Sequence, residues 1–288
     1  GTAGKRLRPL LTLLSCHASG GNWKSALPAA AAVETIHNFS LVHDDIQDRS
    51  STRRGRPTVW SLWGEAQAIN AGDTIFVLAH MCIHRMAGGS VPPDRILTVS
   101  SILDQACLEL TFGQHLDLAF ETQSDVTVEQ YNRMIHGKTA SLLAAACEIG
   151  GVIAGADPDH ARHFHDFGIH LGKAFQIQDD ILGIWGNNEQ TGKPSGDDIL
   201  SRKKTMPILL GLQESPIFLS CWQKEAISPE DLPEMLNALN HNNIYERTLQ
   251  ESEKHTHRAL ESLKLACTNK EGFQLLSTLA QSLLNRNF

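Results

Sequence analysis

The chain lacks the features of a secreted or membrane-spanning protein. Its six cysteines are scattered and form no CxxC pair or Cys/His cluster, so we expect neither a disulfide framework nor a zinc site. No signal-peptide pattern is visible at the start, although a motif follows so soon that we expect residues to precede Gly1. The most apolar stretch, 142–156, is interrupted by Glu148 and Gly150 and is too short to span a bilayer. We therefore expect a cytoplasmic protein without a transmembrane segment.

Basic charge is also scarce. The 288 residues include 25 Lys plus Arg and 32 Asp plus Glu, which gives a formal net charge of −7. A phosphate backbone requires a basic protein face, so the composition argues against nucleic acid as a general partner. An anionic ligand of this chain has to be held by local cations or by a metal.

Runs of alternating β-branched residues are absent, whereas apolar residues recur at helical steps of three and four. Glycine and proline pairs such as Gly88-Gly89 and Pro92-Pro93 separate the helical stretches. The predicted helical stretches are 29–48, 64–86, 94–121, 127–154, 159–185, 206–213, 229–239, 244–265 and 271–284. No repeat or linker divides them, so the sequence predicts one all-α domain over residues 1–288, built from about ten helices.

The first chemical signal is Asp44-Asp45-Ile46-Gln47-Asp48. On a helix, residues four apart share one face, so Asp44 and Asp48 point the same way while Asp45 is rotated by about 100°. Three close carboxylates repel one another unless a cation neutralises them, and carboxylate oxygens suit Mg²⁺. By itself the pattern also fits a solvated acidic helix end.

A second acidic pair, Asp179-Asp180, lies within the apolar stretch FQIQDDILG. Carboxylates rarely occupy such surroundings without a partner or a metal. A purely structural helical scaffold has no need of acids inside apolar helices, so two such clusters favour a metal site.

Basic residues gather in separate groups. They are GKRLRP at 4–9, RRGRP at 53–57, GKPSGDD at 192–198 and RKKT at 202–205. Each group alone resembles a solvated surface patch, but Arg and Lys also bind diphosphate oxygens well. An acidic cluster followed by basic residues, twice in one chain, favours metal-bridged diphosphate binding. The Gly192-Lys193 step is no P-loop, because the GxxxxGK[ST] pattern is missing.

Taken in order, these motifs resemble those of the trans-isoprenyl diphosphate synthases. They are GKRLRP, HDDIQD, RRGRP, GQHLDL, HGKTASLL, FQIQDDIL, GKPSGDD and KKT, and they run from Lys5 to about Pro207. The resemblance implies a helical bundle around a deep apolar cavity and a homodimer. It also implies condensation of isopentenyl diphosphate with an allylic diphosphate, with three Mg²⁺ ions as cofactor.

The resemblance assigns metal ligands residue by residue. Asp44 and Asp48 resemble ligands of two Mg²⁺ ions with Asp45 in support, and Asp179 resembles the ligand of the third, with Asp180 beside it. The third acid of the second motif is replaced here by Gly183. We expect activity to survive with weaker affinity for the third ion.

The resemblance also assigns substrate contacts. The allylic diphosphate would be held by Arg53, Lys138, Lys193 and Lys203. Isopentenyl diphosphate would be held by Lys5, Arg8, His37 and Arg54. The polar positions lining the reaction site are Thr139, Gln176, Gln114 and Asp117. For His37, a structural hydrogen-bonding role is the alternative.

Ionisation of the allylic diphosphate places negative charge on the leaving group, where Mg²⁺, Lys and Arg stabilise it. The carbocation needs dipoles such as Thr139 and Gln176, and the released diphosphate is the expected base.

A terpene cyclase shares the first acidic motif but has no use for an isopentenyl diphosphate pocket. A non-catalytic subunit of a prenyl synthase would usually have damaged acidic motifs. Both remain alternatives.

Product length depends on the residues one helical turn before Asp44, which the growing chain has to pass. These are Ser40 and Phe39. A phenylalanine there predicts early termination, so we expect a C20 product, with C15 next.

Overall fold

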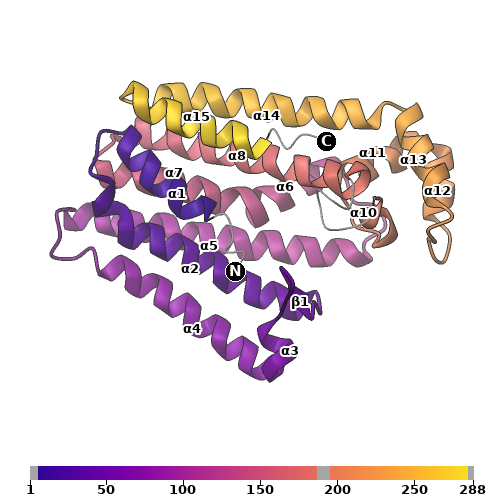
Figure 1. The fold of residues 1–288 in the computed structure, drawn as a ribbon, viewed down its shortest axis with the longest axis horizontal. Helices are drawn as coiled ribbons and strands as arrows, with labels where there is room; N and C mark the ends of the chain where they lie inside the picture. Colours follow the sequence, from indigo (N-terminus) through magenta and orange to yellow (C-terminus); the bar gives the residue numbers. More distant parts are fainter. Residues whose placement is uncertain (1–5, 187–194, 285–288) are drawn as a thin grey trace. The chain divides into compact units, whose positions relative to one another are not determined.

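The structure is a computed structural model that describes residues 6–186 and 195–284, and most of the described residues are helical (Figure 1). The predicted all-α class is confirmed. The elements are α1 (Leu7–Ala18), η1 (Trp23–Ala26), α2 (Leu27–Gln47), β1 (Thr52–Arg53), β2 (Arg56–Pro57), α3 (Val59–Trp63), α4 (Glu65–His84), α5 (Pro93–Thr122), α6 (Val128–Ile135), η2 (His136–Ala140), α7 (Ser141–Ala154), α8 (Pro158–Trp185), α10 (Asp197–Leu200), α11 (Met206–Glu214), α12 (Pro216–Trp222), α13 (Leu232–His241), α14 (Ile244–Ala266) and α15 (Lys270–Leu284).

The chain divides into two compact units. The first consists of Gly1–Cys107, Leu142–Asp166 and Leu263–Leu276, and the second of Leu108–Ser141, Phe167–Ser262 and Ser277–Phe288. The single domain expected from the sequence stays a prediction.

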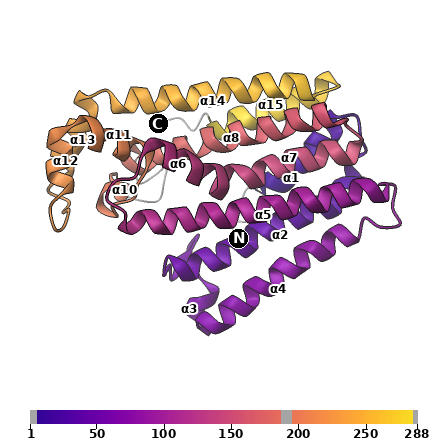
Figure 2. The ribbon, with the colours of Figure 1, turned by 180° about the vertical axis from the view of Figure 1, so that it is seen from behind.

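In the first unit, α2 carries much of the core. Its buried face consists largely of small residues, among them Ala29, Ala32 and Val33, which let neighbouring helices approach closely. Helix α4 packs along α2, and the two lie side by side from the front and from behind (Figures 1 and 2). This pair of helices positions the first acidic motif at the end of α2.

Helix α7 is the buried helix expected at 142–156. Gly150 lies against α1 so closely that a Cβ atom there would be 2.4 Å from the carbonyl oxygen of Thr12. Any larger residue would push the two helices apart, because backbone atoms cannot rotate away. This contact explains the glycine that interrupts the apolar run.

Two helical stretches in the described part of the chain are long and apolar enough to cross a membrane. They are Pro93–Thr122 and Val128–Ala154. In the second, 78% of the most apolar window is buried inside the protein, as in the core helix of a globular domain; in the first, the share is 33%. Length and composition alone therefore give only weak support for a membrane span.

In the second unit, α8 is the central element. Ile177 and Ile181 on α8 pack with Tyr131 and Met134 of α6 and with Leu209 of α11 in one apolar cluster. A second cluster, which includes Ile184 of α8, joins α10, α11, α12 and α13. The two clusters fix α8 on several sides, so the acidic pair in its second half is held in place.

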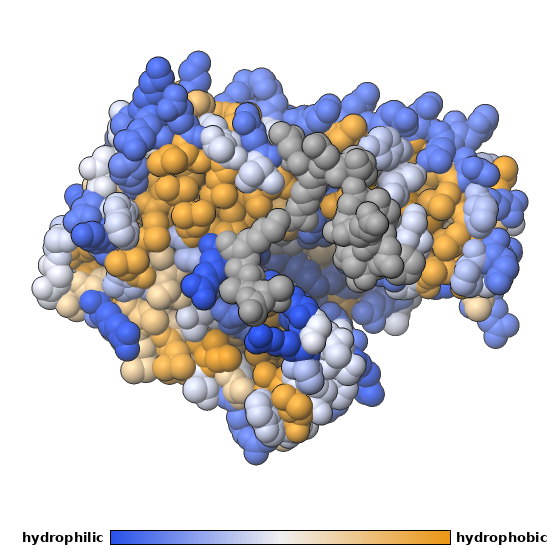
Figure 3. Space-filling model, in the orientation of Figure 1, coloured by the Kyte–Doolittle hydropathy of each residue, from blue (hydrophilic) through white to orange (hydrophobic). Residues whose placement is uncertain are grey.

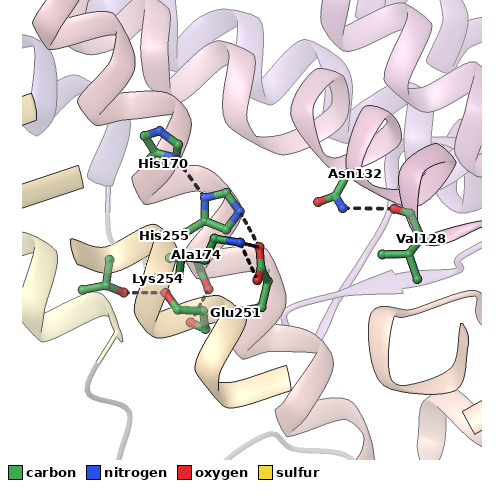
Figure 4. Close-up of polar contacts among 9 residues, drawn as sticks. Val128, Asn132, His170, Ala174, Glu251, Lys254 and His255 are labelled. Carbon is green, nitrogen blue, oxygen red and sulfur yellow. Dashed lines mark hydrogen bonds and ion pairs between the residues drawn. The ribbon is translucent and has the colours of Figure 1, made fainter. Parts of the chain in front are cut away.

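Polar contacts join α8 to α14 within the second unit (Figure 4). The Nδ1 atoms of His170 and His255 are 2.9 Å apart, and Ser252 donates to the carbonyl of Ala174 at 3.2 Å. Burial, followed by the nearby His170, lowers the pKa of His255 to about 4. His255 is therefore neutral near pH 7, and one ring nitrogen of the pair donates to the other.

Candidate functional site

The first acidic motif lies at the C-terminal end of α2. Asp45 is buried and accepts a hydrogen bond from Nε of Arg53 at 2.6 Å, whereas Asp44 is half-buried and Asp48 is exposed. A helix C-terminus carries partial negative charge, so carboxylates there are unfavourable unless a cation lies nearby. Asp45 orients Arg53, and Asp44 and Asp48 form the accessible acidic face. The supporting role expected for Asp45 stays a prediction.

The basic residues after this motif form a β-hairpin, which sequence reasoning did not find. Strands β1 and β2 pair antiparallel around Arg54 and Gly55, whose φ angles of 52° and 72° are typical of a two-residue type I′ turn. Strands of two residues are too short to show the alternation of polar and apolar side chains that marks a strand in a sequence. The only signal for a turn was Gly55, which follows two arginines. Trp60 donates to the carbonyl of Ser50 at 2.8 Å and helps hold the base of the hairpin.

A second cationic cluster lies beside α2. Arg8 of α1 is half-buried, and its Nε atom is buried without a hydrogen-bond partner among the described residues. Burial lowers the pKa of Arg8 to about 10, with Glu34 opposing and Arg54 adding to the shift. A buried guanidinium donor with no partner is costly. An anion such as a phosphate would satisfy it.

His37 faces the same cluster. Burial, followed by the positive charges of Arg8, Arg54 and Arg53, lowers its pKa to about 3. The imidazole is therefore neutral near pH 7 and carries no positive charge. Burial also raises the pKa of Glu34, against the opposing effect of the arginines. Lys5, the remaining residue expected here, lies outside the described residues.

Phe39 takes part in an aromatic row between α2 and α4. Its ring centroid is 4.8 Å from that of His43 and 5.1 Å from that of Phe76, and Phe76 lies 4.6 Å from His80. Nε2 of His80 lies 2.8 Å from Oδ1 of Asp104, within hydrogen-bonding distance. Ser40 is buried and donates to the carbonyl of His37. The structure thus brings Phe39 together with the Phe76 region, which makes a rigid aromatic wall.

In the second unit, the motifs GQHLDL and HGKTASLL meet through two glycines. A Cβ atom on Gly113 would be 2.1 Å from the backbone nitrogen of Lys138, and one on Gly137 would be 2.4 Å from the carbonyl oxygen of Glu109. The close approach places the Lys138 ammonium against the carboxylate of Asp117 as an ion pair. Gln114, on the same helix, is buried.

Lys138 and Thr139 lie in η2, a single turn of π-helix. Such turns interrupt α-helices and are frequent at functional sites. Thr139 donates from Oγ1 to Oε1 of Gln176 on α8 at 2.8 Å. Sequence periodicity does not reveal a π turn, because it shifts the register of the helix by only one residue.

The second acidic pair splits into two roles. Asp179 is half-buried, but Asp180 is 2% exposed and accepts hydrogen bonds from Tyr131, Gln176 and the backbone nitrogen of Met206. Burial raises the pKa of Asp180 to about 6, against the opposing effect of Lys203. Asp179 is the more accessible carboxylate of the pair.

Gly183 stands where the third acid was expected, and the structure shows what occupies its space. A Cβ atom on Gly183 would be 2.1 Å from Oδ2 of Asp198. Asp198 is itself buried. A carboxylate is therefore present beside the second motif, supplied by α10 instead of α8. Asp198 belongs to the quoted GKPSGDD motif, but its linear position gave no sign that it reaches Gly183.

Lys203 lies close to this acidic group. Desolvation lowers its pKa, but the negative charges of Asp198, Asp180 and further carboxylates outweigh that effect and raise the pKa above its ordinary value. Its neighbours are engaged elsewhere: Arg202 donates to the carbonyl of Trp222 at 2.9 Å, and Lys204 to that of Phe120 at 3.1 Å. Lys193 lies outside the described residues.

The donor set fits magnesium. No three His, Cys, Asp or Glu side chains converge as a metal cage anywhere in residues 6–186 and 195–284. Mg²⁺ does not require such a cage, because it keeps several waters and takes one or two carboxylates plus substrate phosphates. Asp44 and Asp48 in the first unit, and Asp179 in the second, are each accessible or half-buried carboxylates of the kind that Mg²⁺ binds.

Comparison with known proteins places these motifs in a family. The polyprenyl synthetase family model matches residues 1–239. The chain is 44% identical over 205 residues to a (2E,6E)-farnesyl diphosphate synthase of Mycobacterium tuberculosis strain H37Rv. That match covers 71% of this chain but 56% of the relative, so the chain spans little more than half the length of this relative.

Solved structures agree. Geranylgeranyl pyrophosphate synthetase from Pyrococcus horikoshii Ot3 is 34% identical, with a TM-score of 0.92 over 99% of this chain and 86% of that one. Geranylgeranyl pyrophosphate synthase from Corynebacterium glutamicum, complexed with isoprenyl diphosphate and magnesium, is 29% identical, with a TM-score of 0.87 over 99% and 87% of the two chains. This chain belongs to the polyprenyl synthetase family.

Proposed function

We propose that the chain is a magnesium-dependent trans-prenyltransferase that condenses isopentenyl diphosphate with an allylic diphosphate. The primer is dimethylallyl, geranyl or farnesyl diphosphate, and the product is an all-trans prenyl diphosphate, with C20 favoured and C15 next. Similarity to farnesyl and geranylgeranyl diphosphate synthases supports a short product. The observation that carries the proposal is the buried, unpartnered Nε of Arg8 beside Arg54 and His37.

That cluster matters because condensation requires two diphosphate sites, whereas a terpene cyclase requires one. Isopentenyl diphosphate would be held by Arg8 and Arg54, with neutral His37 as a hydrogen-bonding partner. The allylic diphosphate would be held by Arg53, Lys138 and Lys203. Lys5 and Lys193 stay predictions from the motif.

Each residue contributes to the reaction in a defined way. Bound magnesium, with three ions expected, would stabilise the charge that develops on the leaving diphosphate. Asp44, Asp48 and Asp179 would hold the ions, and Lys138 would contact the same leaving group. Thr139 and Gln176 would present their dipoles to the allylic carbocation. The double bond of isopentenyl diphosphate then attacks, and the released diphosphate removes a proton.

The test is incubation of the purified chain with Mg²⁺, labelled isopentenyl diphosphate and each allylic primer in turn, followed by sizing of the products. We expect elongation that requires Mg²⁺. Arg8→Gln should raise the KM for isopentenyl diphosphate by about 10- to 100-fold, because a charge-assisted contact is lost, and should leave the KM for the primer unchanged.

The other outcomes discriminate the alternatives. A cyclised hydrocarbon formed without consumption of isopentenyl diphosphate would identify a terpene cyclase. No elongation with any primer would favour a non-catalytic subunit. An Arg8→Gln effect on both substrates equally would remove Arg8 from a dedicated isopentenyl diphosphate site.

Phe39 is the proposed determinant of product length. Its ring is fixed between His43 and Phe76, so it forms a wall in the path that lies one turn from Asp44. Phe39→Ala removes the ring and opens space beside Phe76, so products longer than those of the wild type are expected. Chromatography of the dephosphorylated alcohols measures the shift, with Phe39→Leu as the conservative control. An unchanged product distribution would exclude Phe39 from length control.

We further propose a homodimer. Helix α4 packs on α2, but Ile69, Val77, Leu78 and Met81 on it are exposed, and Figure 3 shows apolar side chains over α3 and α4. An exposed apolar face of this kind is typical of a protein–protein contact. The molar mass in solution, measured by light scattering, tests this; a monomer at micromolar concentration would contradict it.

A cytoplasmic location agrees with six unpaired cysteines and is tested by cell fractionation.

A further inference from the structure

Within the second unit, one continuous chain of hydrogen bonds leads from the protein core to Thr139. The Tyr131 hydroxyl donates to Oδ2 of Asp180 at 2.6 Å, and Nε2 of Gln176 donates to Oδ1 of the same carboxylate at 3.1 Å. Thr139 in turn donates to Oε1 of Gln176 at 2.8 Å. Three helical elements, α6, η2 and α8, therefore meet in a single polar chain.

The chemistry of the groups sets the direction of every hydrogen bond in this chain. A carboxylate only accepts, so Asp180 requires the NH₂ group of Gln176 to face it. The amide oxygen of Gln176 then faces Thr139, and because that oxygen also only accepts, the Thr139 hydroxyl must donate its single hydrogen to it. What remains on Thr139 Oγ1 is a pair of acceptor lone pairs.

The Tyr131 end of this hydrogen-bond chain is held in place by packing. Tyr131 is 1% exposed and lies in the apolar cluster with Ile177 and Ile181. A capping box formed by Thr127 and Gln130 defines the start of its helix. The backbone nitrogen of Met206 also donates to Oδ2 of Asp180, at 3.2 Å. Asp180 is thus held by donors from three directions.

This surrounding makes Asp180 a poor magnesium ligand. It is 2% exposed, and both of its oxygens accept hydrogen bonds from the protein. Mg²⁺ gives up its waters reluctantly, so it binds carboxylates that solvent can reach. Asp179, the adjacent half-buried carboxylate, meets that condition better.

We propose that Tyr131 is a positioning residue for prenyl transfer, which acts through Asp180 and Gln176 to keep the Thr139 hydroxyl turned as an acceptor toward the allylic carbocation. Asp180 is part of this hydrogen-bond chain and does not bind magnesium. The proposal rests on the proposed function. A lone pair fixed beside a developing positive charge stabilises the transition state without reorganisation, whereas a freely rotating hydroxyl does so less well.

The experiment compares Tyr131→Phe, Asp180→Asn and Asp179→Asn. Tyr131→Phe keeps the ring and removes only the hydroxyl, and it is expected to lower kcat about tenfold, in line with one hydrogen bond to a charged group. The KM values and the half-saturating Mg²⁺ concentration should stay at their wild-type values. Tyr245→Phe, at the chain's other tyrosine, is the matched control and should leave kcat unchanged.

Two further readouts separate positioning from plain stability. In the Thr139→Val background, Tyr131→Phe should cause no further loss, because residues that act through one another are not additive. Magnesium titration by calorimetry with a non-hydrolysable allylic diphosphate analogue should show weaker binding in Asp179→Asn and unchanged binding in Asp180→Asn. Thermal melting checks that each variant is folded at the assay temperature.

Additive losses from Tyr131→Phe and Thr139→Val would overturn the positioning role. A shift of the magnesium midpoint in Asp180→Asn as large as that in Asp179→Asn would overturn the assignment of Asp180. Wild-type protein that elongates no primer would instead contradict the proposed function, while the calorimetric comparison would still decide the role of Asp180.

Discussion

Gly137→Ala is expected to lower kcat about 100-fold, because it displaces the π turn that carries Lys138 and Thr139. The added Cβ atom would lie 2.4 Å from the carbonyl oxygen of Glu109 on α5. Backbone atoms cannot rotate away as a side chain can, so the turn itself has to move. A displacement of about 1 Å is enough for a loss of this size. Steady-state kinetics with saturating substrates measures the effect.

Gly113→Ala disturbs the same contact from α5, because its Cβ atom would lie 2.1 Å from the backbone nitrogen of Lys138. We expect the same loss of kcat as for Gly137→Ala. Both variants should also melt at a temperature lower by about 5 °C, since overpacking costs about 1–3 kcal/mol. Gly89→Ala is the control, because its Cβ atom would lie 3.1 Å from the carbonyl oxygen of Met86, a contact that a shift of a few tenths of an ångström in this exposed turn relieves. A kcat within threefold of wild type in both site variants would show that this approach does not position Lys138.

Gly183→Asp is expected to lower activity, although it restores the third acid of the second motif. A side chain at this position would have to displace the Asp198 carboxylate, because a Cβ atom would lie 2.1 Å from Oδ2 of that buried residue. The added carboxylate would also repel Asp198 and the neighbouring Asp180. We expect kcat to fall about 100-fold, as for other displaced catalytic groups. The measurement is kcat together with the Mg²⁺ concentration that gives half-maximal rate.

Two companion variants identify the cause. Gly183→Ala adds only the Cβ atom and should show most of the loss if space is decisive. The double variant Gly183→Asp/Asp198→Gly moves the carboxylate from α10 to α8, and it should recover part of the activity of the single variant. Higher activity or tighter magnesium binding in Gly183→Asp alone would show that Asp198 does not stand in for the missing acid.

Much of the fold could be predicted from the sequence, because helical periodicity is a local property. The all-α class followed from apolar residues at steps of three and four, and it is confirmed. The hairpin around Arg54 and Gly55 could not be predicted, because its strands contain two residues each. The division of the chain into two units gave no sign in composition or linkers, since both units are assembled from separated segments.

The sequence by itself determined the family and the set of charged residues, because these depend on the order of short motifs such as HDDIQD and FQIQDDIL. Only the tertiary structure decided which carboxylates bind other side chains of the protein and which stay accessible. It assigned Asp45 to Arg53 and Asp180 to Tyr131, and it placed Asp198 in the space that Gly183 leaves open. The physical reason is that the role of a carboxylate depends on its burial and its donors, and these come from residues distant in the chain.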